Sequence, residues 1–156
     1  MGIVIEDRTD LSRLTEDMKR EADKAILKAA EYLKDEIQKN ADSSVDAYGN
    51  GFARYNKKYL ARRAAGKAKG TTGKEFYGGP AVNLQLSGNM LGSIDTRVIR
   101  QTSNPTAELF FNDSFANKVA TNLNKDRKFF ALSPRYNQLV LDWFADEYQP
   151  FNTRRR

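Results

Sequence analysis

The sequence of 156 residues contains no cysteine and no histidine. The lack of cysteine excludes disulfides, thiolate zinc sites and a cysteine nucleophile. The lack of histidine removes the commonest general base near neutral pH and a common ligand of transition metals. No apolar run approaches the roughly 18 residues of a membrane-spanning helix. The composition therefore favours an intracellular protein that is not an enzyme and has no membrane partner.

Length and composition fit a single domain that spans residues 1–156. A chain of this length can bury roughly 70% of the surface of its unfolded state, so it can fold without disulfides or metals. Hydrophobic residues make up 40% and charged residues 29% of the chain. This balance is typical of a globular protein with a hydrophobic core.

The formal net charge of +6 is concentrated in one segment. Residues 1–49 carry eight basic and twelve acidic side chains, whereas residues 50–75 carry eight basic and one acidic. Residues 76–156 carry ten basic and seven acidic side chains, and three of the ten lie in a basic tail at 151–156. A basic segment can follow a phosphate backbone without reading its sequence. A solvated loop rich in lysine gives the same pattern.

Apolar residues recur at steps of three and four, which predicts one long amphipathic helix over about residues 11–41. Its apolar positions are Leu11, Leu14, Met18, Ala22, Ala25, Ala29, Leu33 and Ile37. Asp10 is suited to cap the N-terminus of this helix. Such a stripe indicates a core face more often than a coiled coil.

The helical pattern breaks down after residue 41, in a stretch that holds eight of the chain's fourteen glycine and proline residues. We predict a flexible basic excursion at residues 48–80, because a structureless stretch of this length is usually functional or disordered. Within it, a short helix is possible with Phe52, Tyr55 and Tyr59 on one side.

Regular patterns return after Pro80. Alternating apolar residues predict strands at 82–86 and 94–102, and a further strand at 107–111. Turn residues at 103–106 join the last two strands into a hairpin.

A helix is then expected to open at Asn112-Asp113-Ser114 and to present Phe115, Val119 and Leu123 on one face. Asn122 and Asn124 are suited to the left-handed turn that ends a helix.

Residues 128–132 are apolar and are predicted to be extended. Ser133 and Pro134 open a last helix, since serine caps well and proline suits the first helical position. Its apolar face comprises Leu139, Val140, Trp143, Phe144 and Glu147 or Tyr148. The whole order predicts an α+β fold: an antiparallel sheet packed by a long N-terminal helix and a C-terminal helix, with a long flexible basic loop.

No motif for catalysis or metal binding is present in usable form. Adjacent carboxylates such as Asp35 and Glu36 point in different directions on a helix. Gly66 and Lys67 lack the Ser or Thr of a phosphate-binding loop, and Ser87 has no histidine to activate it. The spacing of Asp42, Asp46 and Glu75 matches no calcium loop. We therefore expect no catalytic, cofactor-binding or metal-binding residues.

Three segments carry a resemblance to a known family. Residues 84–94 read LQLSGNMLGSI, residues 115–120 read FANKVA, and residues 127–133 read RKFFALS. In this order they resemble the tail-completion and head–tail joining (neck) proteins of tailed bacteriophages and prophages. Those proteins share an N-terminal helix and a step of the form L-x-L-[ST]-G-x-[ML]-x-x-S-[IL]. The resemblance covers about residues 11–145, and residues 84–94 are its most specific part.

The resemblance implies a structural protein of the virion neck or proximal tail, assembled in the bacterial cytoplasm. Copies would form a homo-oligomeric ring, expected to be hexameric, that completes the tail and joins it to the head connector. Its partners would be the neighbouring head-connector and tail-tube or terminator proteins, with viral double-stranded DNA passing through the lumen. A tail terminator or other minor tail protein is the nearest variant. A sequence-nonspecific nucleic-acid-binding protein is the alternative from another class.

Two groups of residues are candidate site residues. The first would face a neighbouring protein or DNA and comprises Phe52, Arg54, Tyr55, Lys57, Lys58, Tyr59, Arg62, Arg63, Lys67 and Lys69. The second forms a structural corner and comprises Ser87, Gly88, Met90, Leu91 and Ile94. We favour a docking arm over a lumen lining for the first group, because interfaces use aromatic anchors.

Overall fold

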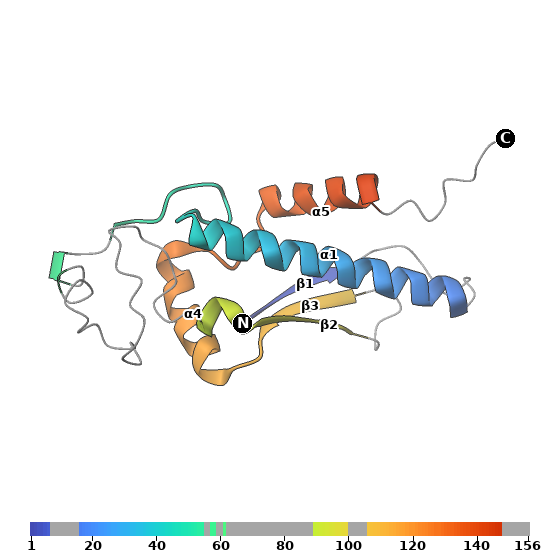
Figure 1. Cartoon of the computed structure of the whole chain (residues 1–156), viewed down its shortest axis with the longest axis horizontal. Coiled ribbons are helices and arrows are strands. Elements are labelled where there is room, and N and C mark those ends of the chain that lie inside the picture. Colours follow the sequence, from blue (N-terminus) through green and yellow to red (C-terminus); the bar gives the residue numbers. More distant parts are fainter. Residues whose placement is uncertain (7–15, 55–56, 59–60, 62–88, 100–105, 148–156) are drawn as a thin grey trace.

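The computed structural model describes residues 1–6, 16–54, 57–58, 61, 89–99 and 106–147. Figure 1 shows the helices and strands within these ranges. In chain order they are β1 (Gly2–Glu6), α1 (Glu16–Asp42), α3 (Asn89–Gly92), β2 (Ile94–Val98), β3 (Thr106–Phe111), α4 (Ser114–Arg127) and α5 (Pro134–Glu147). The predicted strand at 82–86 and the basic tail at 151–156 lie outside the described residues.

The three strands form one antiparallel sheet in the order β1-β3-β2. Helix α1 packs over this sheet, and α5 packs against α1 on the other side, where the rings of Tyr32 and Trp143 stack with centroids 6.4 Å apart. Figure 1 shows α5 and the sheet on opposite sides of α1. The chain therefore has the predicted α+β fold, with a long N-terminal helix and a C-terminal helix on one face of an antiparallel sheet.

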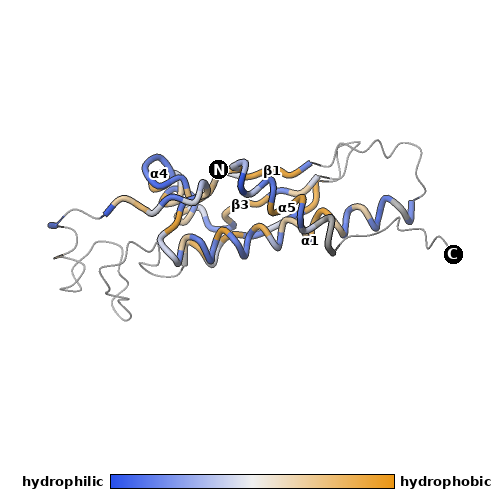
Figure 2. The backbone as a smooth tube through the Cα atoms, turned by 90° about the horizontal axis from the view of Figure 1, so that it is seen from above, coloured by the Kyte–Doolittle hydropathy of each residue, from blue (hydrophilic) through white to orange (hydrophobic). Residues whose placement is uncertain are grey.

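Helix α1 has the predicted amphipathic character over its 27 described residues. Its buried positions include Ala25, Ala29 and Ala30, which are at most 3% exposed. Because alanine has a small side chain, the backbone of α1 can approach the sheet closely. Apolar and polar residues alternate along the tube of α1 in Figure 2, as expected for a helix with one buried face. The predicted cap, Asp10, lies outside the described residues.

The sheet has one apolar face and one mixed face, because side chains alternate along each strand. Ile3 of β1 lies opposite Leu109 of β3, which lies opposite Thr96 of β2, and this row faces α1. The next row, on the other face, is formed by Val4, Glu108 and Arg97. Arg97 is ion-paired with Glu108 at 2.7 Å.

Strand β1 was not predicted from the sequence. Its five residues read GIVIE, and only Ile3 is fully buried, at 5% exposure. The strand forms because β2 occupies only one side of β3. The backbone groups of β1 bond the other side of β3 and complete a three-stranded sheet. The alternation of its burial and its β-branched residues are the signals that could have indicated it.

Helix α4 begins where predicted, but it presents a different face to the core. Asp113 caps it by accepting a hydrogen bond of 2.6 Å from the amide of Ala116. Ala116 and Ala120 are buried, whereas Phe115 is 69% exposed. The prediction that Phe115 leads the apolar face was wrong, because two alanines fit the close approach of α4 to the rest of the core. Val119 and Leu123 are partly buried.

Helix α4 also ends later than predicted. The left-handed residue is Lys128, with φ 43° and ψ 37°, and not Asn122 or Asn124. The side chain of Asn124 instead bonds both backbone groups of Phe130, at 2.8 Å and 2.9 Å. Residues 128–132 are consequently a tight loop rather than an extended strand, and it buries the rings of Phe129 and Phe130.

Candidate interaction surface

The predicted contact residues separate into three groups in the structure. The side chains of Arg54, Lys57 and Lys58 are exposed. Phe52 is not: it is 9% exposed and belongs to the hydrophobic core, so the prediction that it faces a partner or DNA needs correction. The remaining predicted residues, which lie outside the described residues, are Tyr55, Tyr59, Arg62, Arg63, Lys67 and Lys69.

Phe52 is held in the core by a turn that the sequence was expected to leave flexible. The carboxylate of Asp46 accepts hydrogen bonds from the amides of Tyr48 and Asn50, at 2.9 Å and 2.8 Å. The amide of Phe52 then donates to the carbonyl of Ser44 at 2.7 Å. Residues 43–52 therefore fold against the core, and an excursion can begin only after Phe52.

This turn exposes an aromatic ring next to a cation. Tyr48 is 49% exposed, and the Lys128 ammonium lies 5.8 Å from the centroid of its ring. The two residues are held together because the amide of Ala47 donates to the carbonyl of Lys128 at 3.1 Å. Lys128, Tyr48 and the nearby Arg135 form what we call the Tyr48 patch; the Arg135 guanidinium lies beside Gly49.

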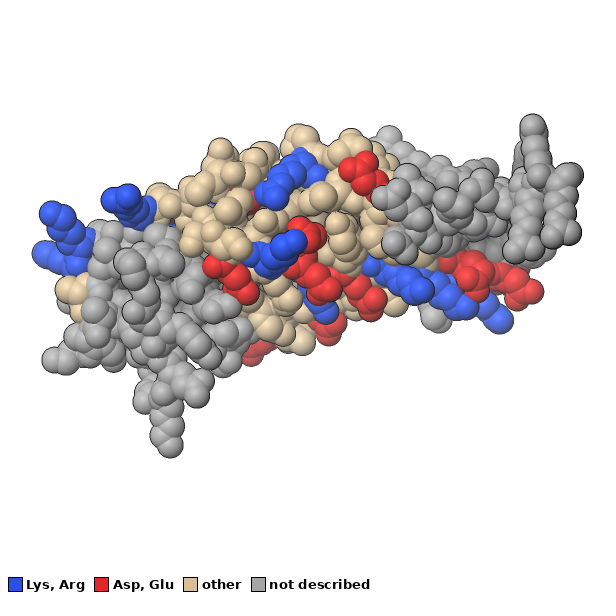
Figure 3. All heavy atoms as spheres, turned by 45° about the horizontal axis from the view of Figure 1, so that its top comes forward, with Lys and Arg blue, Asp and Glu red and all other residues tan. Residues whose placement is uncertain are grey.

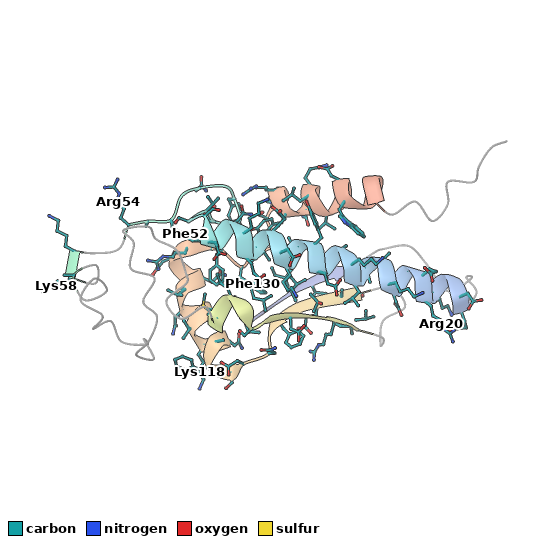
Figure 4. All side chains as sticks on the ribbon, viewed as in Figure 1. Arg20, Phe52, Arg54, Lys58, Lys118 and Phe130 are labelled. Carbon is teal, nitrogen blue, oxygen red and sulfur yellow. The ribbon has the colours of Figure 1, made fainter. Side chains whose placement is uncertain are left out.

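The Tyr48 patch and the first basic residues of the excursion lie at the same end of the molecule. Figure 4 shows Arg54 and Lys58 beyond the C-terminal end of α1. Lys118 of α4 lies at the same end of the molecule. Figure 3 shows basic side chains that project there. An exposed aromatic ring among cations is suited to an acidic protein surface or to a phosphate backbone.

A buried polar network supports the Tyr48 patch from below. Ser133 caps α5 by accepting from the amide of Tyr136 at 3.1 Å, and its hydroxyl donates to the carbonyl of Ala47. Asn40 donates to the Tyr136 hydroxyl at 3.2 Å. Burial raises the pKa of Tyr136, because its anion would lose hydration, while the hydrogen bond from Asn40 acts in the opposite direction. This network fixes the ends of α1 and α5 to the turn that carries Tyr48.

The structural corner lies on the other side of α1. Met90, Leu91 and Ile94 are 7%, 5% and 3% exposed, so all three are core residues. The carbonyl of Leu91 accepts a hydrogen bond of 2.8 Å from the side-chain amide of Gln38 in α1. Helix α3 is a single turn that returns these apolar side chains to the core before β2 begins. Ser87 and Gly88 of the corner lie outside the described residues.

Sequence reasoning missed the residues of the Tyr48 patch. Tyr48 and Arg135 are 87 positions apart by number, and no periodicity links them. The signal that could have found the turn is Asp46 followed by Asn50 and two glycines, because aspartate favours turns in which it bonds the backbone two residues later. Lys128 could not have been found, since a lysine with positive φ has no sequence signature.

Within the described residues, no group of three or more acidic side chains is arranged to hold a metal ion. No helix in the same part of the chain is long and apolar enough to cross a membrane. Comparison of the sequence with family models and curated proteins, and of the chain with solved structures, finds no match.

Proposed function

We propose that this chain is a structural protein of a tailed-phage virion, located at the neck or the proximal end of the tail. Copies assemble into a ring, hexameric by the resemblance to tail-completion and head–tail joining proteins. The ring completes the tail, joins it to the head connector and leaves a lumen for viral double-stranded DNA. Its work is assembly, and it carries out no catalysis.

The observation that carries the proposal is the corner at residues 89–94. The resemblance is most specific over residues 84–94, which include this corner, and its apolar step implies a tight return of side chains to the core. Met90, Leu91 and Ile94 make that return, and Gln38 ties the corner to α1. The order of a long helix, this corner, a hairpin and two helices also fits the order that the resemblance implies.

The basic end of the molecule supplies a surface for the neighbouring ring. The described acidic and basic residues of α1 are largely paired within the helix, as at Lys24 and Glu21, 2.6 Å apart. Arg54, Lys57 and Lys58 are exposed at the other end of the chain's folded part. In this proposal they begin an arm that docks on acidic residues of the next ring, with Tyr48 as an aromatic anchor in place of Phe52.

The test is the fate of particles that lack the chain. An early stop codon in its gene, in a phage or prophage that carries it, should give DNA-filled heads and separate tails in electron micrographs. The purified protein should have the native mass of a closed ring. Normal joined particles from the stop-codon phage would refute the proposal.

The Tyr48 patch also favours a second candidate, a protein that binds nucleic acid without sequence specificity. An exposed tyrosine ring beside the Lys128 ammonium is an arrangement that proteins use to bind single-stranded nucleic acid. The bases stack on the ring, and the cation contacts the phosphates. Binding of this kind weakens steeply as salt rises. A double-logarithmic plot of DNA affinity against salt would show a clear negative slope for the free monomer, and Lys128→Glu would reduce the slope. No binding at low salt would eliminate this candidate.

A further inference from the structure

The three-stranded sheet has two outer edges, and no strand of the described residues pairs with either. The amide of Ile99 donates to the carbonyl of Thr106, and the amide of Asn112 donates to the carbonyl of Ser93. Odd-numbered residues of β2 therefore bond β3, and the backbone groups of even-numbered residues point to the open edge. By the same alternation, Ile3 and Ile5 of β1 bond β3, and its even-numbered residues point outwards.

The outer edge of β1 is accessible. Its outward residues, Gly2, Val4 and Glu6, are all exposed, and Val4 is 49% exposed. An accessible row of backbone donors and acceptors beside an apolar side chain is a template for another strand. A Cβ atom at Gly2 would lie 2.8 Å from the Glu108 carboxylate, so a larger residue there would push the Glu108 side chain aside.

The outer edge of β2 is guarded at its centre. The carboxylate of Asp95 accepts a hydrogen bond of 2.8 Å from the amide of Thr96, the middle residue that points outwards. This bond is local and involves a side chain that is not fully buried, so an incoming strand can replace it with a carbonyl. The two edges thus differ. The β1 edge is exposed to an incoming strand, whereas the Thr96 amide at the β2 edge must first release the Asp95 carboxylate.

We propose that β1 of one copy adds to the β2 edge of the next copy, in parallel, and that this strand pairing joins neighbours in the ring. The inference rests on the proposed ring and names its contact. β1 and β2 run in the same direction, since both are antiparallel to β3. Head-to-tail addition of identical copies therefore gives a parallel pair, and repetition by rotation closes a ring.

The positions of the side chains agree with this pairing. In a parallel pair, a residue whose backbone groups bond the partner strand lies opposite a residue whose backbone groups point away from it. Val4, which points out of its own sheet, would therefore lie opposite an odd-numbered residue of β2. Even-numbered residues of β1 and odd-numbered residues of β2 both place their side chains on the sheet face away from α1. The sheets of neighbouring copies can therefore join with their helices on the same side.

Charge selects the register and excludes the competing pairing. With Glu6 opposite Arg97 of the next copy, Val4 lies opposite Asp95 and Gly2 opposite Ser93. The Arg97 side chain is 62% exposed and can reach a carboxylate on either side. If two β1 strands paired with each other around Val4, Glu6 would lie beside Gly2 of the partner, where the Glu108 carboxylate already is. Like charges at neighbouring positions disfavour that dimer.

The absence of cysteine makes a disulfide test direct. Directly opposite residues of neighbouring strands have the Cα separation that a disulfide needs. The Val4→Cys/Asp95→Cys variant should form, on mild oxidation, a covalent ladder that ends at the copy number of the ring. Each single variant should stay a monomer on a denaturing gel. Lys24→Cys/Gln138→Cys is the control, because both side chains are exposed, and α1 and α5 do not form either edge of the sheet.

The outcomes separate the contact from the proposed function. A covalent dimer from Val4→Cys alone would show pairing of two β1 strands and overturn the inference. A native ring with no ladder, both from this pair and from Glu6→Cys/Arg97→Cys, would overturn the contact and leave the ring. A monomeric native mass with no ladder would overturn both. A ladder together with normal joining in the stop-codon phage would keep the contact and refute the neck function.

Discussion

The side-chain amide of Asn40 in α1 donates a hydrogen bond of 3.2 Å to the hydroxyl of Tyr136 in α5, across 96 positions of the sequence. Both side chains are buried, and Tyr136 has no exposed surface. Asn40 also accepts from Arg135, at 3.4 Å, so one amide serves two residues of α5. The contact fixes how the last helix sits on the first.

Removing the Asn40 amide should therefore destabilise the protein. Asn40→Ala leaves the Tyr136 hydroxyl buried without its donor, which should lower the free energy of unfolding by about 1–3 kcal/mol. Urea denaturation followed by circular dichroism measures the change. Asn137→Ala is the matched control, since Asn137 is exposed on α5 and its loss should have an effect within about 0.5 kcal/mol. Equal stability of both variants would contradict the buried network.

The raised pKa of Tyr136 predicts a loss of stability in alkali. The unfolded tyrosine ionises near its usual pKa of 10.0, whereas the folded one stays neutral to higher pH. The unfolded state then binds fewer protons, so the stability that Tyr136 contributes is complete below about pH 10 and falls above it. The difference in unfolding free energy between the wild type and Tyr136→Phe should shrink as pH rises above 10. A constant difference would contradict the burial of this hydroxyl.

Truncation of the corner should test whether it belongs to the core. Leu91→Ala should lower the free energy of unfolding by about 2–5 kcal/mol, because Leu91 is 5% exposed and its loss leaves a cavity. Leu141→Ala removes the same atoms from a side chain that is 60% exposed, so its effect should stay within about 0.5 kcal/mol. Thermal melts of the two variants give the comparison. Similar melting temperatures would mean that the corner is not packed.

The left-handed backbone at Lys128 predicts a stabilising substitution. A residue with a Cβ atom is strained there by about 1–2 kcal/mol, and glycine is not. Lys128→Gly should therefore be more stable than Lys128→Ala, which also removes the charge but keeps the Cβ atom. The free energies of unfolding of the two variants should differ by about 1 kcal/mol. The difference is smaller than the full strain because glycine also raises the conformational entropy of the unfolded chain. A less stable glycine variant would place Lys128 in an ordinary helical conformation.

The docking-arm hypothesis makes its own prediction for the basic segment. Replacing both Tyr55 and Tyr59 by alanine should leave heads and tails unjoined, because the arm loses its aromatic anchors. Reversing Arg62, Arg63, Lys67 and Lys69 to glutamate should mainly change DNA passage if the segment instead lines the lumen. Electron microscopy and plaque assays separate the two. Normal infectious particles from the tyrosine variant would rule out the docking arm.

The elements with strong periodicity could be predicted from the sequence. The alanine-rich stripe of α1, the hairpin of β2 and β3, and the start of α5 at Pro134 all follow from local patterns. The apolar step at Met90, Leu91 and Ile94 indicates core or interface residues, and the structure places all three side chains in the core.

The elements that depend on distant partners could not be predicted. β1 is a strand only because β3 offers it an edge, and Phe52 is buried only because Asp46 folds its turn back on the core. The buried face of α4 was predicted wrongly because phenylalanine is more hydrophobic than alanine. The close packing of α4 instead buries Ala116 and Ala120 and leaves Phe115 exposed. In each case tertiary packing outweighs the local pattern.

The hydrogen bond within β2 also bears on how the chain behaves before it meets a neighbour. Open growth of sheets into fibres needs two free edges on each molecule. By occupying the amide of Thr96, Asp95 leaves a newly made chain with one ready edge. Replacing this hydrogen bond costs an incoming strand free energy, so unguided addition should be slower at the β2 edge than at the β1 edge. If neighbours pair as proposed, the same carboxylate should let the protein accumulate as single chains and join only where a correctly placed strand displaces it.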